Sequence, residues 1–243
     1  MVGVVKVEKR WGKTPKPGKA DVEEVLRTDV GNGTVYIYRI EVDEHHPVGG
    51  FYVATYGSKD EPDRIWGFGE TPEEALVDAI RNRDKEELAR VKEDETKKYF
   101  NPFLKAYRPL KEKVREEVKG VLELVVDEGE EIMEEDLENE ELLTEEAHYL
   151  RGRTVGILDV ELVLNAGTVA VYRMSVPLIE GNKMNLPTYF YIVTLGVDGV
   201  EKVWGLGGTV KGALEDAVKK WDELTGGYAN PFRKVLKTVE EEG

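Results

Sequence analysis

Four short blocks of this sequence occur twice, in the same order. "TVYIYRIEV" at residues 34–42 matches "TVAVYRMSV" at 168–176, and "FYVATYG" at 51–57 matches "FYIVTLG" at 190–196. The other two pairs are "WGFGETPEEALVDAI" with "WGLGGTVKGALEDAV", beginning at Trp66 and Trp204, and "NPFLK" with "NPFRK", at 101–105 and 230–234. Repetition of this kind indicates repeated structural units, so the sequence predicts two homologous units. We divide the chain into a basic N-terminal segment (1–20), a first α+β repeat (21–108), a helical acidic connector (109–150) and a second α+β repeat (151–243).

Each repeat has the pattern of several strands followed by a helix. The blocks at 34–42 and 51–57 are rich in β-branched and aromatic residues with period-two alternation, which favours strands. "VGNG" at 30–33 and "LNAG" at 164–167 contain the residues of tight hairpin turns, so a strand should precede each of them. The predicted fold class is therefore α+β, with two tandem units, each a four-stranded antiparallel sheet followed by one or two helices.

Two motifs in each repeat predict helix starts. Thr71 is a good N-cap, and Glu74, three residues later, completes a capping box; Thr209 is the corresponding N-cap in the second repeat. In both "NPF" blocks an N-capping Asn precedes a Pro, which fits the first helical position, so each Phe should face back to the sheet.

The glycines of "WGFG" and "WGLG" raise the possibility of a phosphate-binding loop. A dinucleotide fingerprint needs the spacing G-x-G-x-x-G, but the third glycine position is Pro72 in one copy and Val210 in the other. The favoured interpretation is structural: the glycines let the last strand turn into the helix.

The order of a "GFYVATYG" strand (50–57), a further strand and a "GETPEEALVDAI" helix start (69–80) resembles the HicB antitoxin family. Members of that family commonly show a "GYYVA"-like strand and a "GDTPEEAL"-like helix start, and the segments at 189–196 and 207–218 are similar to them as well. The resemblance covers about a third of the chain. It implies a small β-β-β-α fold, described as a degraded ribonuclease-H-like fold, and a protein that neutralises a small ribonuclease toxin by binding it.

Composition narrows the class of protein. No run of about 18 apolar residues is present, so no membrane-spanning helix is expected, and the start of the chain turns basic too soon for a signal peptide. The chain lacks Cys, which excludes disulfides and thiolate metal sites. These features favour a cytoplasmic protein. The absence of Gln, with 34% charged residues, is typical of hyperthermophiles, and we expect an archaeal source.

Charge is distributed unevenly along the chain. The net charge of −15 argues against a large duplex-DNA footprint. Residues 127–146 contain twelve acidic and no basic side chains, whereas residues 1–20 contain six basic ones and a single Glu. Such blocks are often interaction segments, although a solvated connector and a solubilising tail are the alternatives. The predicted partner-binding residues are Glu130, Glu131, Glu134, Glu135, Asp136, Lys9, Arg10, Trp11, Lys13 and Lys16.

The candidates for catalysis are few. "VDEHHP" offers Asp43, Glu44, His45 and His46 as metal ligands, but adjacent His side chains in an extended chain point apart, so a solvated loop is favoured. Asp159 and Glu161 share one face of a strand, as the first carboxylates of a two-metal nuclease would. They also fit the wet face of an amphipathic strand. "WGKT" at 11–14 lacks the first glycine of a phosphate loop. No catalytic, cofactor-binding or metal-binding residue is therefore assigned, and no cofactor is predicted.

Three functions remain open. The leading one is a non-enzymatic binding or inhibitory protein whose acidic surface meets a basic partner, either toxin-like or nucleic-acid-processing. The second is an RNA- or ribosome-associated factor that uses the basic N-terminus. The third is a metal-dependent nuclease built on Asp159 and Glu161. The sequence leaves the oligomeric state open.

Overall fold

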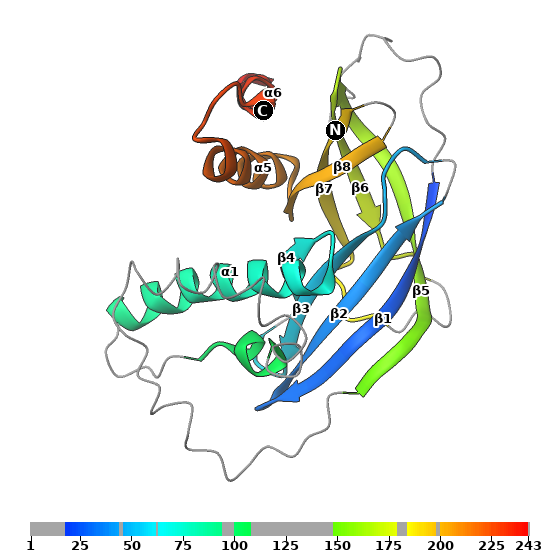
Figure 1. Cartoon of the computed structure of the whole chain (residues 1–243), viewed down its shortest axis with the longest axis vertical. Helices are drawn as coiled ribbons and strands as arrows, with labels where there is room; N and C mark the ends of the chain where they lie inside the picture. The colour runs from blue at the N-terminus through cyan, green and yellow to red at the C-terminus, as the bar shows by residue number, and fades with distance from the viewer. Residues whose placement is uncertain are drawn as a thin grey trace.

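The computed structural model describes residues 18–43, 46–61, 63–93, 100–107, 148–178, 184–197 and 200–242 (Figure 1). The first half of the chain forms β1 (Gly18–Val30), β2 (Gly33–Val42), β3 (Phe51–Ser58), β4 (Arg64–Gly69) and α1 (Pro72–Glu93), followed by a short helix over residues 102–107. The second half forms β5 (His148–Ala166), β6 (Val169–Ser175), β7 (Tyr189–Val197), β8 (Val200–Gly207), α5 (Val210–Thr225) and α6 (Pro231–Glu242). Within these ranges no helix is long and apolar enough to span a membrane.

All eight strands belong to one antiparallel sheet, in the order β4-β3-β2-β1-β5-β6-β7-β8. The prediction of two separate four-stranded units was therefore wrong. β1 and β5, the longest strands, pair from Gly18 opposite Val160 to Arg27 opposite His148. In an isolated four-stranded sheet, β1 would leave one edge unpaired, and pairing with β5 satisfies the backbone groups of that edge. The acidic connector predicted between the units lies outside the described residues, except that 148–150 belong to β5.

The sheet curves until it is nearly a barrel, and its inner face carries a core shared by both halves. Tyr38, Phe51 and Ile40 of the first half and Tyr172 and Phe190 of the second are almost completely buried there. Either half alone would expose this apolar face to water, at a cost of about 25 cal/mol per Å². Burial of the inner face is thus a second reason why the eight strands form one sheet.

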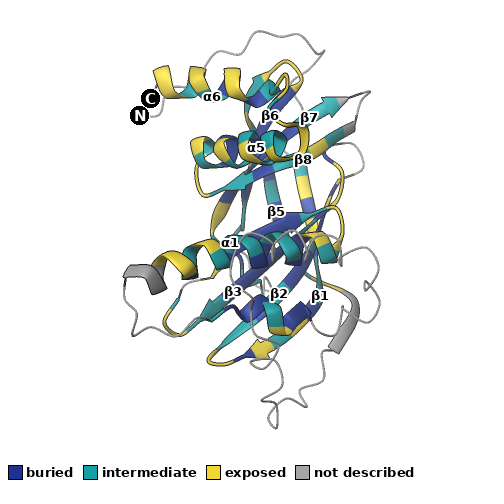
Figure 2. Ribbon diagram, turned by 60° about the vertical axis from the view of Figure 1, so that its left-hand side comes forward, coloured by how far each residue is buried: buried dark blue, intermediate teal, exposed yellow. Residues whose placement is uncertain are grey.

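The helices lie on the outer face of the sheet, where each half has its own core. α1 packs on β4, β3 and β2, whereas α5 packs on β8 and β7. Figure 2 shows the resulting pattern, with buried residues along the sheet and exposed residues along α6. Phe103 and Phe232 are fully buried, which confirms that both "NPF" segments start a helix with the ring turned to the sheet.

The two "NPF" asparagines make the same hydrogen bonds in the two halves. Asn101 donates to the Ile80 carbonyl oxygen at 3.1 Å and accepts from the Phe103 N–H at 3.0 Å. Asn230 donates to the Val218 carbonyl oxygen at 3.0 Å and accepts from Phe232 at 2.9 Å. Besides capping its own helix, each Asn therefore ties that helix to the preceding one.

The paired glycines allow a helix to approach a strand closely. A Cβ atom on Gly67 would overlap the backbone of Ala75 and Ala79 in α1, and one on Gly205 would overlap the backbone of Ala213 and Ala217 in α5. The structural interpretation of these glycines holds, but their role differs from the expected one. They provide space between strand and helix, whereas we expected them to turn the chain.

Candidate functional site

Alternation along the central strands separates a charged outer face from the apolar inner one. On β1, Ala20 and Val22 point into the inner core, so Lys19, Asp21 and Glu23 point outward. β2, β5 and β6 show the same alternation. We call the resulting charged surface the outer strip. It consists of Lys19, Asp21, Glu23, Arg39, Glu41, Asp43, Asp159, Glu161 and Arg173.

The outer strip is acidic and in contact with solvent. Its nine members are six carboxylates and three cations, and the side chains of Glu41 and Glu161 are 52% and 53% exposed. Lys19 pairs with Asp159. Because the ion pairs of the outer strip are exposed, each contributes at most about 1 kcal/mol to stability. The excess of negative charge is therefore available to attract a cationic partner.

Two rows of residues run across the outer strip, each with one residue on each of three neighbouring strands, and the two rows have the same composition. In the first half, Glu23 lies opposite Arg39, which lies opposite Tyr52 on β3. The second half places Glu161, Arg173 and Tyr191 in the same order across β5, β6 and β7. Arg39 lies 3.7 Å from Glu23, and Arg173 lies 2.7 Å from Glu161. Each row thus runs from a central carboxylate through an Arg to a Tyr beside the helix.

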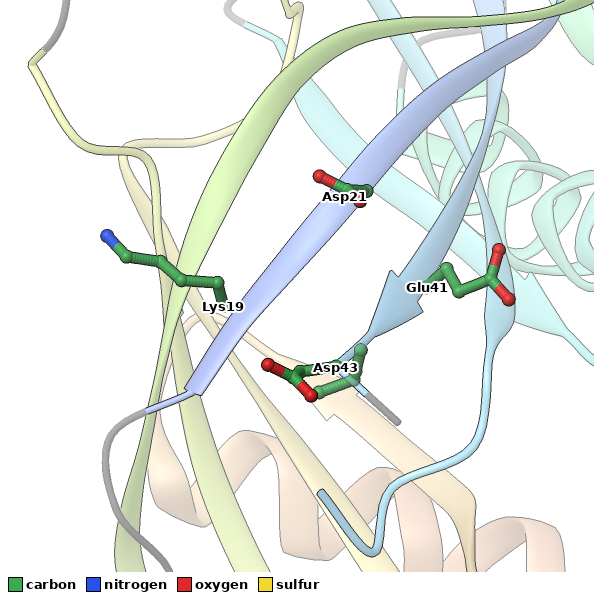
Figure 3. Close-up of a pocket in the computed structure, with 5 residues that line it drawn as sticks. Lys19, Asp21, Glu41 and Asp43 are labelled. Atoms are coloured by element: carbon green, nitrogen blue, oxygen red, sulfur yellow. The ribbon is translucent and has the colours of Figure 1, made fainter. Parts of the chain in front are cut away.

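A pocket of about 350 Å³ lies at one end of the outer strip, lined by Lys19, Asp21, Glu41, Val42 and Asp43 (Figure 3). Lys19 and Glu41 extend in opposite directions from their strands, so the charged groups surround the pocket without converging on one point. Among the described residues the Asp21 carboxylate has no hydrogen bond or ion pair, while the backbone of Asp21 belongs to the sheet. The Lys19 ammonium is engaged by Asp159, which leaves the pocket acidic.

This arrangement allows electrostatic binding of a cationic group, because the carboxylates of the outer strip outnumber its cations. Over the described ranges no group of three or more His, Cys, Asp or Glu side chains is placed to hold a metal ion. Asp159 and Glu161 do share one face of β5, as the sequence predicts, but each forms an ion pair with a cation, Lys19 and Arg173 respectively. The pair therefore matches the wet face of an amphipathic strand.

The structure tests few of the predicted site residues. All ten predicted partner-binding residues lie outside the described ranges: Glu130, Glu131, Glu134, Glu135, Asp136, Lys9, Arg10, Trp11, Lys13 and Lys16. Glu44 and His45 also lie outside them. His46 is half-buried, and its ring lies edge-on to Tyr172 with 5.0 Å between the ring centroids. For His46 the expectation of a solvated loop was wrong.

Sequence reasoning missed a polar cluster inside the sheet. Glu201 on β8 accepts a hydrogen bond from the Thr194 hydroxyl at 2.6 Å, and burial raises the pKa of the neighbouring Tyr172 hydroxyl. The available signal was a carboxylate and a hydroxyl at inward positions of otherwise apolar strands. Alternation alone does not indicate which strand such groups face, so their contact was not predictable.

No protein-family model, curated protein or solved structure matches this chain in the comparisons. The resemblance to HicB antitoxins accordingly stays a prediction.

Proposed function

We propose that this protein is a non-enzymatic binding protein that docks a basic protein partner on its outer strip. The observation that carries the proposal is the negative charge of that strip, which contains six carboxylates and only three cations on one exposed sheet surface. Opposite charge on the two partners accelerates encounter and fixes orientation. The net charge of −15 adds a long-range attraction for the same basic partner.

The pocket supplies a place for one cationic side chain of the partner. Asp21, Glu41 and Asp43 present carboxylate oxygens around it, and Asp21 lacks a cation of its own among the described residues. An arginine guanidinium suits such a site because it donates to two carboxylate oxygens at once and is weakly hydrated. We infer that an Arg of the partner enters this pocket.

Tyrosines border the strip and add apolar contact area. Tyr52 and Tyr191 end the two cross-strand rows, and Tyr189, which is 52% exposed, lies 6.0 Å from Tyr191 between ring centroids. Aromatic residues are enriched in protein interfaces because they bury area at little conformational cost. The partner that fits is basic, either toxin-like or nucleic-acid-processing, as the HicB resemblance also implies. A cytoplasmic location is part of the same proposal.

The test is a pull-down from a hyperthermophilic archaeal lysate at low salt, after nuclease treatment, with three forms of the full chain. The first is wild type, and the second is Asp21→Asn/Glu41→Gln/Asp43→Asn. The third, Glu215→Gln/Glu240→Gln/Glu241→Gln, removes as much charge from exposed positions on α5 and α6. We expect wild type and the helix variant to capture the same basic protein in similar amounts. The pocket variant should capture at least tenfold less of it.

Two outcomes would contradict the proposal. Equal capture by the pocket variant would show that the outer strip does not bind the partner. Capture from an untreated lysate that disappears on nuclease treatment, and on deletion of residues 1–17, would support the RNA-associated alternative.

A further inference from the structure

The connection between β2 and β3 crosses to the far edge of the sheet. β4 and β8 are the two edge strands and are not paired with each other. Residues 46–50, which we call the strap, lie against β8 instead. The Glu201 N–H donates to the Pro47 carbonyl oxygen at 2.9 Å, and the Gly49 N–H donates to the Glu201 carbonyl oxygen at 3.3 Å. The strap thus covers the backbone of an edge strand in the other half of the chain.

Side chains fix the strap from both sides. Val48 is 3% exposed and belongs to the inner core, so the strap also closes part of that core. The ring of His46, at the start of the strap, packs edge-on against Tyr172 of β6, and its Cδ2 lies close to Gly18 of β1. The strap therefore depends on how well His46 fits between β1 and β6.

The fit of His46 requires a neutral ring. Its Nδ1 atom accepts a hydrogen bond from the Val48 N–H at 3.4 Å, which holds the turn of the strap. Once protonated, Nδ1 is a donor and would face another donor. Protonation therefore replaces an attraction with a repulsion at the turn that positions Val48.

The groups around His46 shift its pKa in both directions. Burial lowers the pKa of His46, whereas the Glu201 carboxylate of β8 and the Asp43 carboxylate of the same connection raise it. Glu201 is also held by the Thr194 hydroxyl, and Tyr172 of β6 is the uncharged neighbour. Burial is the largest of these effects, so the closed strap favours neutral His46.

We propose that the strap is a pH-sensitive latch, which releases the edge of β8 and the Val48 side chain when His46 is protonated. Release frees the backbone N–H and C=O of Glu201, two groups that the strap otherwise satisfies. The device lies at the edge of the sheet and on its inner face, whereas the outer strip lies on the other face, and Asp43 is the residue that both share.

The test is amide hydrogen exchange by NMR on the full chain between pH 8 and pH 5, corrected for intrinsic rates. We expect protection of the Glu201 and Gly49 amides to fall by up to about tenfold per pH unit as the pH falls from the ordinary pKa of His46, about 6.5, to its lowered pKa in the closed strap, because opening takes up one proton over that window. Amides of the central β1–β5 pairing should keep their protection. In His46→Asn, whose side-chain oxygen still accepts from Val48 but does not titrate, the two strap amides should become insensitive to pH.

His148→Asn is the matched control and should retain the wild-type pH response. His46→Phe provides a second non-titrating variant, since it keeps the aromatic contact with Tyr172 and loses the acceptor. Unchanged protection of Glu201 and Gly49 across this range in wild type would overturn the proposal. An equal loss of protection in His46→Asn would overturn it as well.

Discussion

Lys220 on α5 donates a hydrogen bond to the Asp78 carboxylate on α1 across 2.8 Å, although 142 residues separate them in the chain. The same ammonium lies 3.6 Å from Asp216 and 3.3 Å from the ring centroid of Phe68. Asp78 and Asp216 also accept the backbone N–H groups of Phe68 and Leu206, on the edge strands β4 and β8. One cation thus joins the helices and edge strands of the two halves.

Replacing this cation should destabilise the fold. We expect Lys220→Met to lower the free energy of unfolding by about 2 kcal/mol, because two partly buried carboxylates then face each other without it. This figure is reduced for the remaining exposure of the cluster. Lys219→Met, which removes an exposed neighbour 4.0 Å from Glu223, should change stability by less than about 0.5 kcal/mol. Guanidinium unfolding of both variants measures the difference, and equal effects would show that the Lys220 cluster does not stabilise the fold.

Two aspartates on α5 should respond to pH in opposite directions. Burial raises the pKa of Asp216, and the Asp78 carboxylate adds to the increase. Ionised Asp216 is therefore less favourable in the folded chain, so wild type loses stability as the pH rises from about 3.8 through the folded pKa. Asp216→Asn should gain stability relative to wild type over that window.

Asp222 provides the opposite case on the same helix. Hydrogen bonds from Asn230 and Arg233 lower the pKa of Asp222. Its ionised form contributes stability that is present above about 3.8 and is lost as the pH falls through the folded pKa. Asp222→Asn should therefore lose stability relative to wild type as the pH rises. Urea unfolding between pH 3 and pH 7 measures both differences, and a common sign would contradict this account.

Lengthening one acidic side chain should stabilise the first half. The Thr55 hydroxyl is fully buried and has no hydrogen-bond partner among the described residues, whereas Thr194 at the equivalent place donates to Glu201. Asp63 stands where Glu201 stands in the second half and is one methylene shorter. We expect Asp63→Glu to raise the free energy of unfolding by about 1 kcal/mol, the usual contribution of such a hydrogen bond. No gain should occur in a Thr55→Val background, and the same gain there would refute the explanation.

A methyl group at the strand–helix contact should be poorly tolerated. Gly67→Ala would place Cβ against the backbone of Ala75 and Ala79, which can move away only if α1 shifts. We expect a loss of about 2–3 kcal/mol, typical of overpacking. Gly208→Ala is the control, because a Cβ there has nothing within 4 Å. Thermal unfolding compares the two, and a nearly neutral Gly67→Ala would mean that the close approach has no structural role.

Local patterns predicted the elements that depend on local physics. The alternation of "TVYIYRIEV" and "FYVATYG" indicated strands, because successive side chains of a strand point to opposite faces of the sheet and the two faces differ in polarity. The Asn and Pro of both "NPF" blocks indicated helix starts, and each Asn caps its helix as expected. The sharing of one face by Asp159 and Glu161 followed from the same alternation.

These local patterns did not predict which strands pair or which distant side chains lie close together. The partner of β1 across its second edge is β5, which begins 118 residues after Val30 and follows a segment that local patterns placed in a connector. The same limit applies to His46 beside Tyr172 and to Lys220 beside Asp78, since side-chain type does not specify a distant neighbour.

The sequence by itself determined the strands, the helix starts and the acidic character of the chain, since these follow from periodicity, capping and composition. Only the tertiary structure decided that the two sets of strands form one curved sheet, because an unpaired edge and an apolar inner face in each half are satisfied together by pairing β1 with β5. That choice also placed the carboxylates of both halves on one outer strip.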